Sequence, residues 1–88
     1  LSIFGYVTDN NLNPLENSVV TATLLNNSGT RETYTDSTDQ NGFYNMKIEF
    51  IGNYEVTATK ENFYDSDPEN VVLSVEQTSV QQDFVLNH

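Results

Sequence analysis

The side chains of this chain that could do chemistry are nearly all carboxylates. The 88 residues include 13 Asp and Glu but only 3 Lys and Arg, which gives a formal net charge of -10 at pH 7. Cys is absent, and the single histidine is His88, the last residue. A thiol nucleophile, an internal imidazole base and a zinc cluster of Cys and His are therefore excluded. The remaining chemistry is that of oxygen ligands, which suit a hard cation such as calcium.

Two acidic clusters are candidate calcium ligands, and their members are Asp36, Asp39, Asp65, Asp67 and Glu69. The first cluster belongs to the segment 36–42, which does not have the spacing of an EF-hand loop. The second surrounds Pro68. We expect the first to be an ordinary turn, with an Asp accepting backbone N–H bonds, and the second to be a solvated loop. Calcium is the alternative for both, and we expect no other cofactor.

Carboxylate pairs can also catalyse glycoside hydrolysis, but that chemistry needs a cleft that raises the pKa of one acid. Acids in solvated loops of so small a domain do not provide such a cleft. We therefore expect the chain not to be an enzyme.

Aromatic side chains form the second group of interest, with five Tyr and five Phe but no Trp. Inward strand positions or a sheet corner account for Tyr44, Tyr54, Phe63 and Phe84. Five others remain candidates for an exposed ligand or partner patch: Phe4, Tyr6, Tyr34, Phe43 and Tyr64. If several of them converge, carbohydrate stacking or docking to a neighbouring domain becomes credible. The strong negative charge disfavours nucleic acid and anionic membranes, and apolar runs of three residues are far too short for membrane insertion.

The elements that must position these groups are strands, because apolar and polar residues alternate along most of the chain. The alternation predicts seven short strands, over residues 3–8, 18–24, 31–38, 44–49, 54–59, 71–75 and 80–86. No window has a sustained period of 3.6, so we expect no helix longer than a turn. The polar segment 31–38 is typical of an edge strand. Segments 44–49 and 54–59 read as a hairpin of about 17 residues around a glycine turn.

Seven such strands indicate an all-β fold, a seven-stranded Greek-key β-sandwich of immunoglobulin-like or transthyretin-like form. The motif order resembles one such family, the carboxypeptidase regulatory-like domain, which has a transthyretin-like (prealbumin-like) sandwich. The motifs that carry the resemblance are Gly5-Tyr6-Val7-Thr8-Asp9, Pro14-Leu15, Ser18-Val19-Val20, Thr38-Asp39-Gln40-Asn41-Gly42-Phe43-Tyr44, Gly52-Asn53-Tyr54-Glu55-Val56 and Asp83-Phe84-Val85-Leu86. They cover nearly the whole chain, so we expect residues 1–88 to be one domain cut from a longer protein.

The resemblance implies a non-catalytic accessory module, attached to secreted peptidases, outer-membrane receptors or microbial surface proteins. We therefore expect an extracellular, cell-surface or periplasmic spacer that docks to neighbouring domains of its own chain or to another surface protein. A carbohydrate-binding module that uses exposed Tyr and Phe is the first alternative. A calcium-stabilised adhesion module is the second. The Lys-to-Asn isopeptide bond of related adhesin domains is not expected, because no Lys precedes Lys47.

Overall fold

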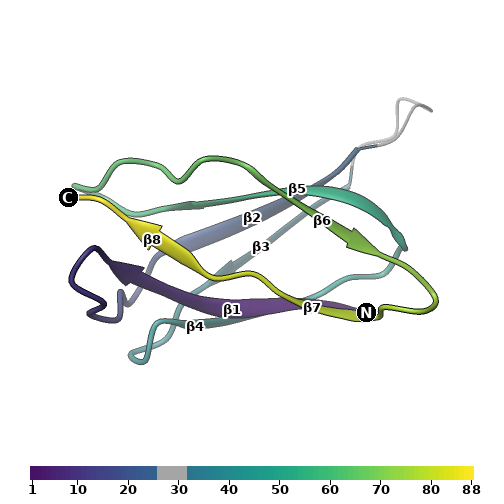
Figure 1. The fold of residues 1–88 in the computed structure, drawn as a ribbon, viewed down its shortest axis with the longest axis horizontal. Helices are drawn as coiled ribbons and strands as arrows, with labels where there is room; N and C mark the ends of the chain where they lie inside the picture. Colours follow the sequence, from purple (N-terminus) through teal and green to yellow (C-terminus); the bar gives the residue numbers. More distant parts are fainter. Residues whose placement is uncertain (26–31) are drawn as a thin grey trace.

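The computed structural model describes residues 1–25 and 32–88, and these residues form two β-sheets that pack as a sandwich (Figure 1). The described residues contain eight strands: β1 (Ser2–Asp9), β2 (Val19–Leu25), β3 (Thr33–Ser37), β4 (Phe43–Lys47), β5 (Gly52–Thr59), β6 (Glu69–Leu73), β7 (Ser79–Gln81) and β8 (Phe84–Leu86). The all-β sandwich is confirmed, with eight strands where the alternation predicted seven. Arg31, the predicted start of the third strand, lies outside the described residues.

One sheet has the order β3-β2-β5-β6, and all its strands are antiparallel. In the other sheet, β1 pairs with β4 in antiparallel fashion and with both β7 and β8 in parallel. The polar strand β3 lies at an edge, as its sequence predicted. Two pairs of strands, β2 with β3 and β5 with β6, are neighbours both in the sequence and in a sheet. Most of the other connections pass from one sheet to the other (Figure 1).

The predicted hairpin between residues 44 and 59 is wrong, because β4 and β5 lie in different sheets. The N–H of Ile48 donates to the Leu1 carbonyl at 2.9 Å and so continues the pairing of β4 with β1. The chain then crosses to the other sheet before β5 begins at Gly52. The crossing is held by Tyr54, whose hydroxyl donates to the Phe50 carbonyl at 2.7 Å.

The turn before β4 has the local structure that its sequence predicted. The Asp39 Oδ1 atom accepts the N–H groups of Asn41 at 2.9 Å and of Phe43 at 3.0 Å, and Gly42 has a φ of 76°. Glycine adopts that φ without steric cost, and a Cβ atom at this position would lie 2.6 Å from the Val7 carbonyl oxygen. However, this turn connects β3 and β4, which are edge strands of different sheets and do not pair with each other.

The core lies between the sheets and is formed by the inward residues of the alternating segments. Its buried members are Ile3, Val7, Leu15, Val20, Ala22, Leu24, Tyr44, Met46, Ile48, Tyr54, Val56, Ala58, Val71, Leu73, Phe84 and Leu86. Two polar side chains are buried beside them, and both are hydrogen-bonded. Thr38 Oγ1 donates to the Leu15 carbonyl and accepts the N–H of Ser18, while Ser18 Oγ donates to the Thr59 carbonyl. Burial raises the pKa of Tyr54 to about 12 and also raises the pKa of Tyr44.

The predicted last strand, 80–86, is interrupted where the chain passes over Gly5. A Cβ atom on Gly5 would overlap the Gln82 carbonyl oxygen and lie 2.7 Å from Asp83 Oδ1. The hydroxyl of Tyr44 also donates to that carbonyl. Beyond the interruption, the N–H of Tyr6 donates to Asp83 Oδ1 at 2.9 Å, so a side chain replaces a backbone acceptor. Two short strands, β7 and β8, result from this local departure from the ladder.

The sandwich is elongated, with principal extents of 38 × 23 × 15 Å. The two termini lie toward opposite ends of its long axis (Figure 1). None of the described segments is a helix of the length and apolar character required to cross a bilayer.

Candidate interaction surfaces

Three of the five candidate patch aromatics share the outer face of the sheet formed by β4, β1 and β7. Along β1, Ile3, Gly5 and Val7 are buried, so the alternation turns Phe4 and Tyr6 outward. The register pairs Tyr6 with Phe43 of β4, and it places Phe4 between Asn45 of β4 and Gln81 of β7. We call this surface the β1 face, with the members Phe4, Tyr6, Phe43, Asn45, Lys47 and Gln81.

The aromatic part of the β1 face is a tilted pair of rings. The centroids of Tyr6 and Phe43 are 5.2 Å apart, and the ring planes meet at 55°. Tyr6 remains 45% exposed, while Phe4 and Phe43 are half-buried. The Gln81 amide donates to Asp83 Oδ1 at 3.2 Å, which holds this side chain beside the rings. The face therefore combines ring surface with a positioned amide.

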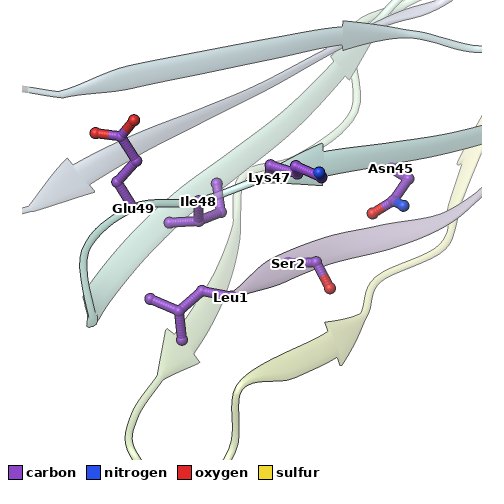
Figure 2. A pocket seen from close by; sticks show the side chains of 6 residues that line it. All are labelled: Leu1, Ser2, Asn45, Lys47, Ile48 and Glu49. Carbon is purple, nitrogen blue, oxygen red and sulfur yellow. The ribbon is translucent and has the colours of Figure 1, made fainter.

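A pocket of about 600 Å³ adjoins this face near the start of β1 (Figure 2). Its lining consists of Leu1, Ser2, Asn45, Lys47, Ile48 and Glu49. Asn45 and Lys47 belong to both the pocket and the β1 face, and Figure 2 shows their side chains on the same stretch of β4. The Ser2 and Ser79 hydroxyls lie 2.8 Å apart and continue the polar border toward β7. The pocket and the rings thus form one continuous surface.

The other two patch candidates lie elsewhere. Tyr34 packs against Tyr54 with a centroid distance of 6.1 Å, and its hydroxyl accepts the N–H of Glu49 at 3.3 Å. Tyr64 is 74% exposed in the connection between β5 and β6, and its N–H donates to the Asn87 carbonyl. The five aromatics therefore do not form a single patch.

The acidic residues of the first candidate calcium cluster form hydrogen bonds to the backbone. Asp36 Oδ2 accepts the N–H of Asn45 at 2.9 Å, and Asp39 accepts the turn N–H groups described above. Asp65, Asp67 and Glu69 are exposed near the start of β6. Within residues 1–25 and 32–88, no three His, Cys, Asp or Glu side chains are grouped so that they could hold a metal ion. Calcium binding stays a prediction from the sequence.

A second surface, which the sequence analysis missed, lies at the end of the sandwich where the chain enters. Five apolar side chains are strongly exposed there: Leu25 at 45%, Phe50 at 49%, Ile51 at 53%, Val72 at 57% and Val75 at 80%. The register places Asn53 between Leu25 and Val72 on the outer side of the second sheet. Gly52 pairs with Leu73, so Ile51 and Val75 lie just beyond the last pair of β5 and β6. We call these five residues the apolar end.

Val75 shows why the apolar end was missed. The alternation of Val71, Leu73 and Val75 predicts three inward residues, and the first two are buried. However, β6 ends at Leu73 because Ser74 and Gln77 close a turn with reciprocal backbone hydrogen bonds of 3.0 and 3.2 Å. Val75 is therefore turned to solvent. The adjacent apolar pair Phe50 and Ile51, directly before Gly52, is the signal that could have indicated this surface.

The chain belongs to the carboxypeptidase regulatory-like domain family, whose model matches residues 2–87. The resemblance of its motifs is thereby confirmed. A search of curated protein sequences finds no significant match.

Solved structures show the same fold. One similar chain comes from a crystal structure of a type II cohesin–X-dockerin complex from Acetivibrio cellulolyticus, a C-terminal interface mutant. It has a TM-score of 0.66 and 21% identity, over 97% of this chain and 56% of that chain. A chain in the N-terminal interface mutant of the same complex has a TM-score of 0.56 and 19% identity, with the same coverage. The present chain thus spans about half the length of these chains.

Proposed function

We propose that the chain is a non-catalytic accessory module of a secreted or cell-surface multidomain protein, where it acts as a spacer and as a docking domain. Membership of the regulatory-like family and the likeness to chains of a protein–protein complex support this proposal. So does the composition, because an acidic surface keeps an extracellular module soluble. The single observation that carries the docking role is the apolar end.

The spacer role is supported by the position of the termini. The N-terminus and the C-terminus lie toward opposite ends of the long axis, so domains joined to them would be held apart by much of the length of the sandwich (Figure 1). Residues close to both termini are also tied to the fold by backbone hydrogen bonds. The Leu1 carbonyl accepts the N–H of Ile48, and the Asn87 carbonyl accepts the N–H of Tyr64. Anchoring of Leu1 and Asn87 to the sheets suits a semi-rigid connector.

The docking role follows from the exposure of the apolar end. A monomeric protein rarely leaves several large aliphatic and aromatic side chains exposed together, unless the surface has a partner. Here five lie at one end of the sandwich. Phe50 lies two residues after Ile48, whose N–H donates to the Leu1 carbonyl, and Val75 lies three residues before Thr78, whose carbonyl accepts the N–H of Ser2. The occupant that we propose is the neighbouring domain on the N-terminal side of the same polypeptide, because a domain joined to Leu1 would lie toward the same end of the sandwich as these residues (Figure 1). The matched chains are longer than this module, which covers 56% of each, and this supports a multidomain setting.

The test compares the amide spectrum of the isolated module with that of the natural full-length polypeptide. We expect the amide shifts of Ile51 and Val75 to change, and their hydrogen exchange to slow, when the neighbouring domain is present. The double variant Ile51→Ser, Val75→Ser should abolish both differences. It should leave the melting temperature of the isolated module nearly unchanged, because both side chains are more than half exposed.

The matched control is Tyr64→Ser, which removes a side chain of similar exposure, 74%, from a different part of the module. This variant should leave the spectral differences in place. Identical spectra at the apolar end, with and without the neighbouring domain, would contradict the docking role.

A further inference from the structure

We propose that the β1 face is a binding site for a neutral oligosaccharide. This inference goes beyond the docking role of the apolar end and does not depend on it. It begins with the side chains of the β1 face, in which rings, amides and hydroxyl groups occupy neighbouring positions of one register. Phe4 lies between the amides of Asn45 and Gln81, and Tyr6 lies beside Phe43.

Such a mixture matches the chemistry of a sugar. A pyranose ring has an apolar face of C–H groups and a rim of hydroxyl groups that both donate and accept hydrogen bonds. An aromatic ring complements the first, and side-chain amides complement the second because each carries donors and an acceptor. On the β1 face, the exposed part of Tyr6 offers the ring surface, and the exposed amides of Asn45 and Gln81 offer the polar groups.

The shape of the surface suits a chain-like ligand. Phe4 and Tyr6 are two residues apart on β1, which places them about 6.6 Å apart along the strand. Beyond Phe4 the surface leads into the pocket at Ser2, Asn45 and Lys47 (Figure 2). From Tyr6 to Ser2 the path covers about 13 Å along β1. A short oligosaccharide can therefore stack on the rings and reach the pocket with its next units.

The negative charge of the chain favours neutral over anionic glycans. The net charge of -10 repels anionic polysaccharides, and two carboxylates, Asp83 and Glu49, border the face and its pocket. Lys47 supplies one cation, which cannot offset this field. A neutral glycan meets no such repulsion and can accept a hydrogen bond from the Lys47 ammonium.

A protein partner fits the β1 face less well than a glycan does. The buried centre of a protein interface is apolar and depleted of charged residues. The β1 face places exposed Asn45, Lys47 and Gln81 among its rings, whereas the apolar end combines four strongly exposed aliphatic side chains with Phe50. The two surfaces thus differ in chemistry, and we assign them to different partners.

The experiment titrates the isotope-labelled 88-residue chain with four neutral hexasaccharides, namely cellohexaose, xylohexaose, mannohexaose and maltohexaose, and with an anionic oligogalacturonate. We expect at least one neutral sugar to bind with a millimolar or lower Kd. It should shift the amides of Phe4, Tyr6, Asn45 and Gln81, and leave those of the apolar end unchanged. Oligogalacturonate should not bind.

Two substitutions then test the residues. Tyr6→Ala and Gln81→Ala should each weaken binding about tenfold or more, a change of about 1.4 kcal/mol. The control Tyr64→Ala, which removes an exposed ring outside the β1 face, should bind as the original chain does. Gln81 is exposed and outside the core, so Gln81→Ala keeps the test valid if Tyr6→Ala loses stability.

Three results would overturn the proposal. The first is the absence of shifts at the β1 face with all four neutral sugars at millimolar concentration. The second is binding that Gln81→Ala and a folded Tyr6→Ala leave unchanged. The third is protection of this face only when a neighbouring protein domain is present, which would make it a protein interface. None of these results bears on the apolar end, so failure here is distinct from failure of the docking role.

Discussion

The substitution Gly5→Ala tests the contact that divides the last strand into β7 and β8. The added methyl group would overlap the Gln82 carbonyl oxygen and lie 2.8 Å from the Gln82 carbonyl carbon. These are backbone atoms, so no side-chain rotation can relieve the overlap. The segment at Gln82 and Asp83, between β7 and β8, must move away from β1, which disturbs the hydrogen bonds from Tyr44 and from the Tyr6 N–H.

The magnitude follows from two contributions. Overpacking of a tightly packed site costs about 1–3 kcal/mol, and the partial loss of the two hydrogen bonds adds about 1 kcal/mol in total. We therefore expect a loss of about 2–4 kcal/mol, a large part of the stability of a small domain. Each kcal/mol lowers the melting temperature of a domain of this size by about 4–8 °C. The melting temperature of Gly5→Ala should fall by at least about 8 °C.

The assay is thermal and urea unfolding followed by circular dichroism, with Ser2→Ala as the control on the same strand. Ser2 faces outward, and its substitution removes only an exposed hydroxyl contact with Ser79. We expect a change within about 0.5 kcal/mol for this control. A Gly5→Ala chain that melts within two degrees of the original would refute the reasoning, because the close approach of Gln82 to β1 would then not exist.

Other predictions follow from the core, the turns and the pKa values. Leu73→Ala and Val20→Ala should each cost about 2–4 kcal/mol in urea unfolding, because both side chains are fully buried; unchanged midpoints would contradict the core assignment. Asp39→Ala should cost about 1 kcal/mol by removing the acceptor of two turn N–H groups, and Asp39→Asn should recover part of it. Backbone N–H groups, that of Asn13 first, lower the pKa of Asp9 below its usual 3.8. The stabilisation by Asp9 is therefore present above pH 3.8 and lost as the pH falls through its folded pKa, so melting curves of the original chain and Asp9→Ala should converge in acid.

The sequence was sufficient to predict which segments are strands and which residues face inward. Period-two alternation located most strand segments, and the inward residues of β2 and β5 are buried as the pattern required. Alternation reports burial of one side of a strand, which is a local property. For the same reason Phe4 and Tyr6 could be recognised as outward residues, while their approach to Asn45 and Gln81 could not.

The pairing of strands could not be predicted from the sequence, because it depends on contacts between residues that are far apart in the chain. A glycine near residue 52 fits a hairpin turn as well as it fits a crossing between sheets, and the choice is made by the pairing of β4 with β1. The interruption at Gln82 depends on a glycine 77 positions earlier. Neither effect leaves a local signature, so β4–β5 pairing and the strand count were the predictions that failed.

The acidic residues Asp36 and Asp39 have a structural role at the edge of β4, which the composition alone could not indicate. An edge strand exposes unpaired backbone groups, through which sheets of different molecules can join. At the outer edge of β4, the N–H groups of Phe43, Asn45 and Glu49 are accepted by Asp39, Asp36 and Tyr34 in turn. These side chains cover part of the edge within the module itself, and two of them add negative charge that repels a second copy. Association through β4 is thereby disfavoured, which leaves side-chain surfaces such as the apolar end and the β1 face for specific partners.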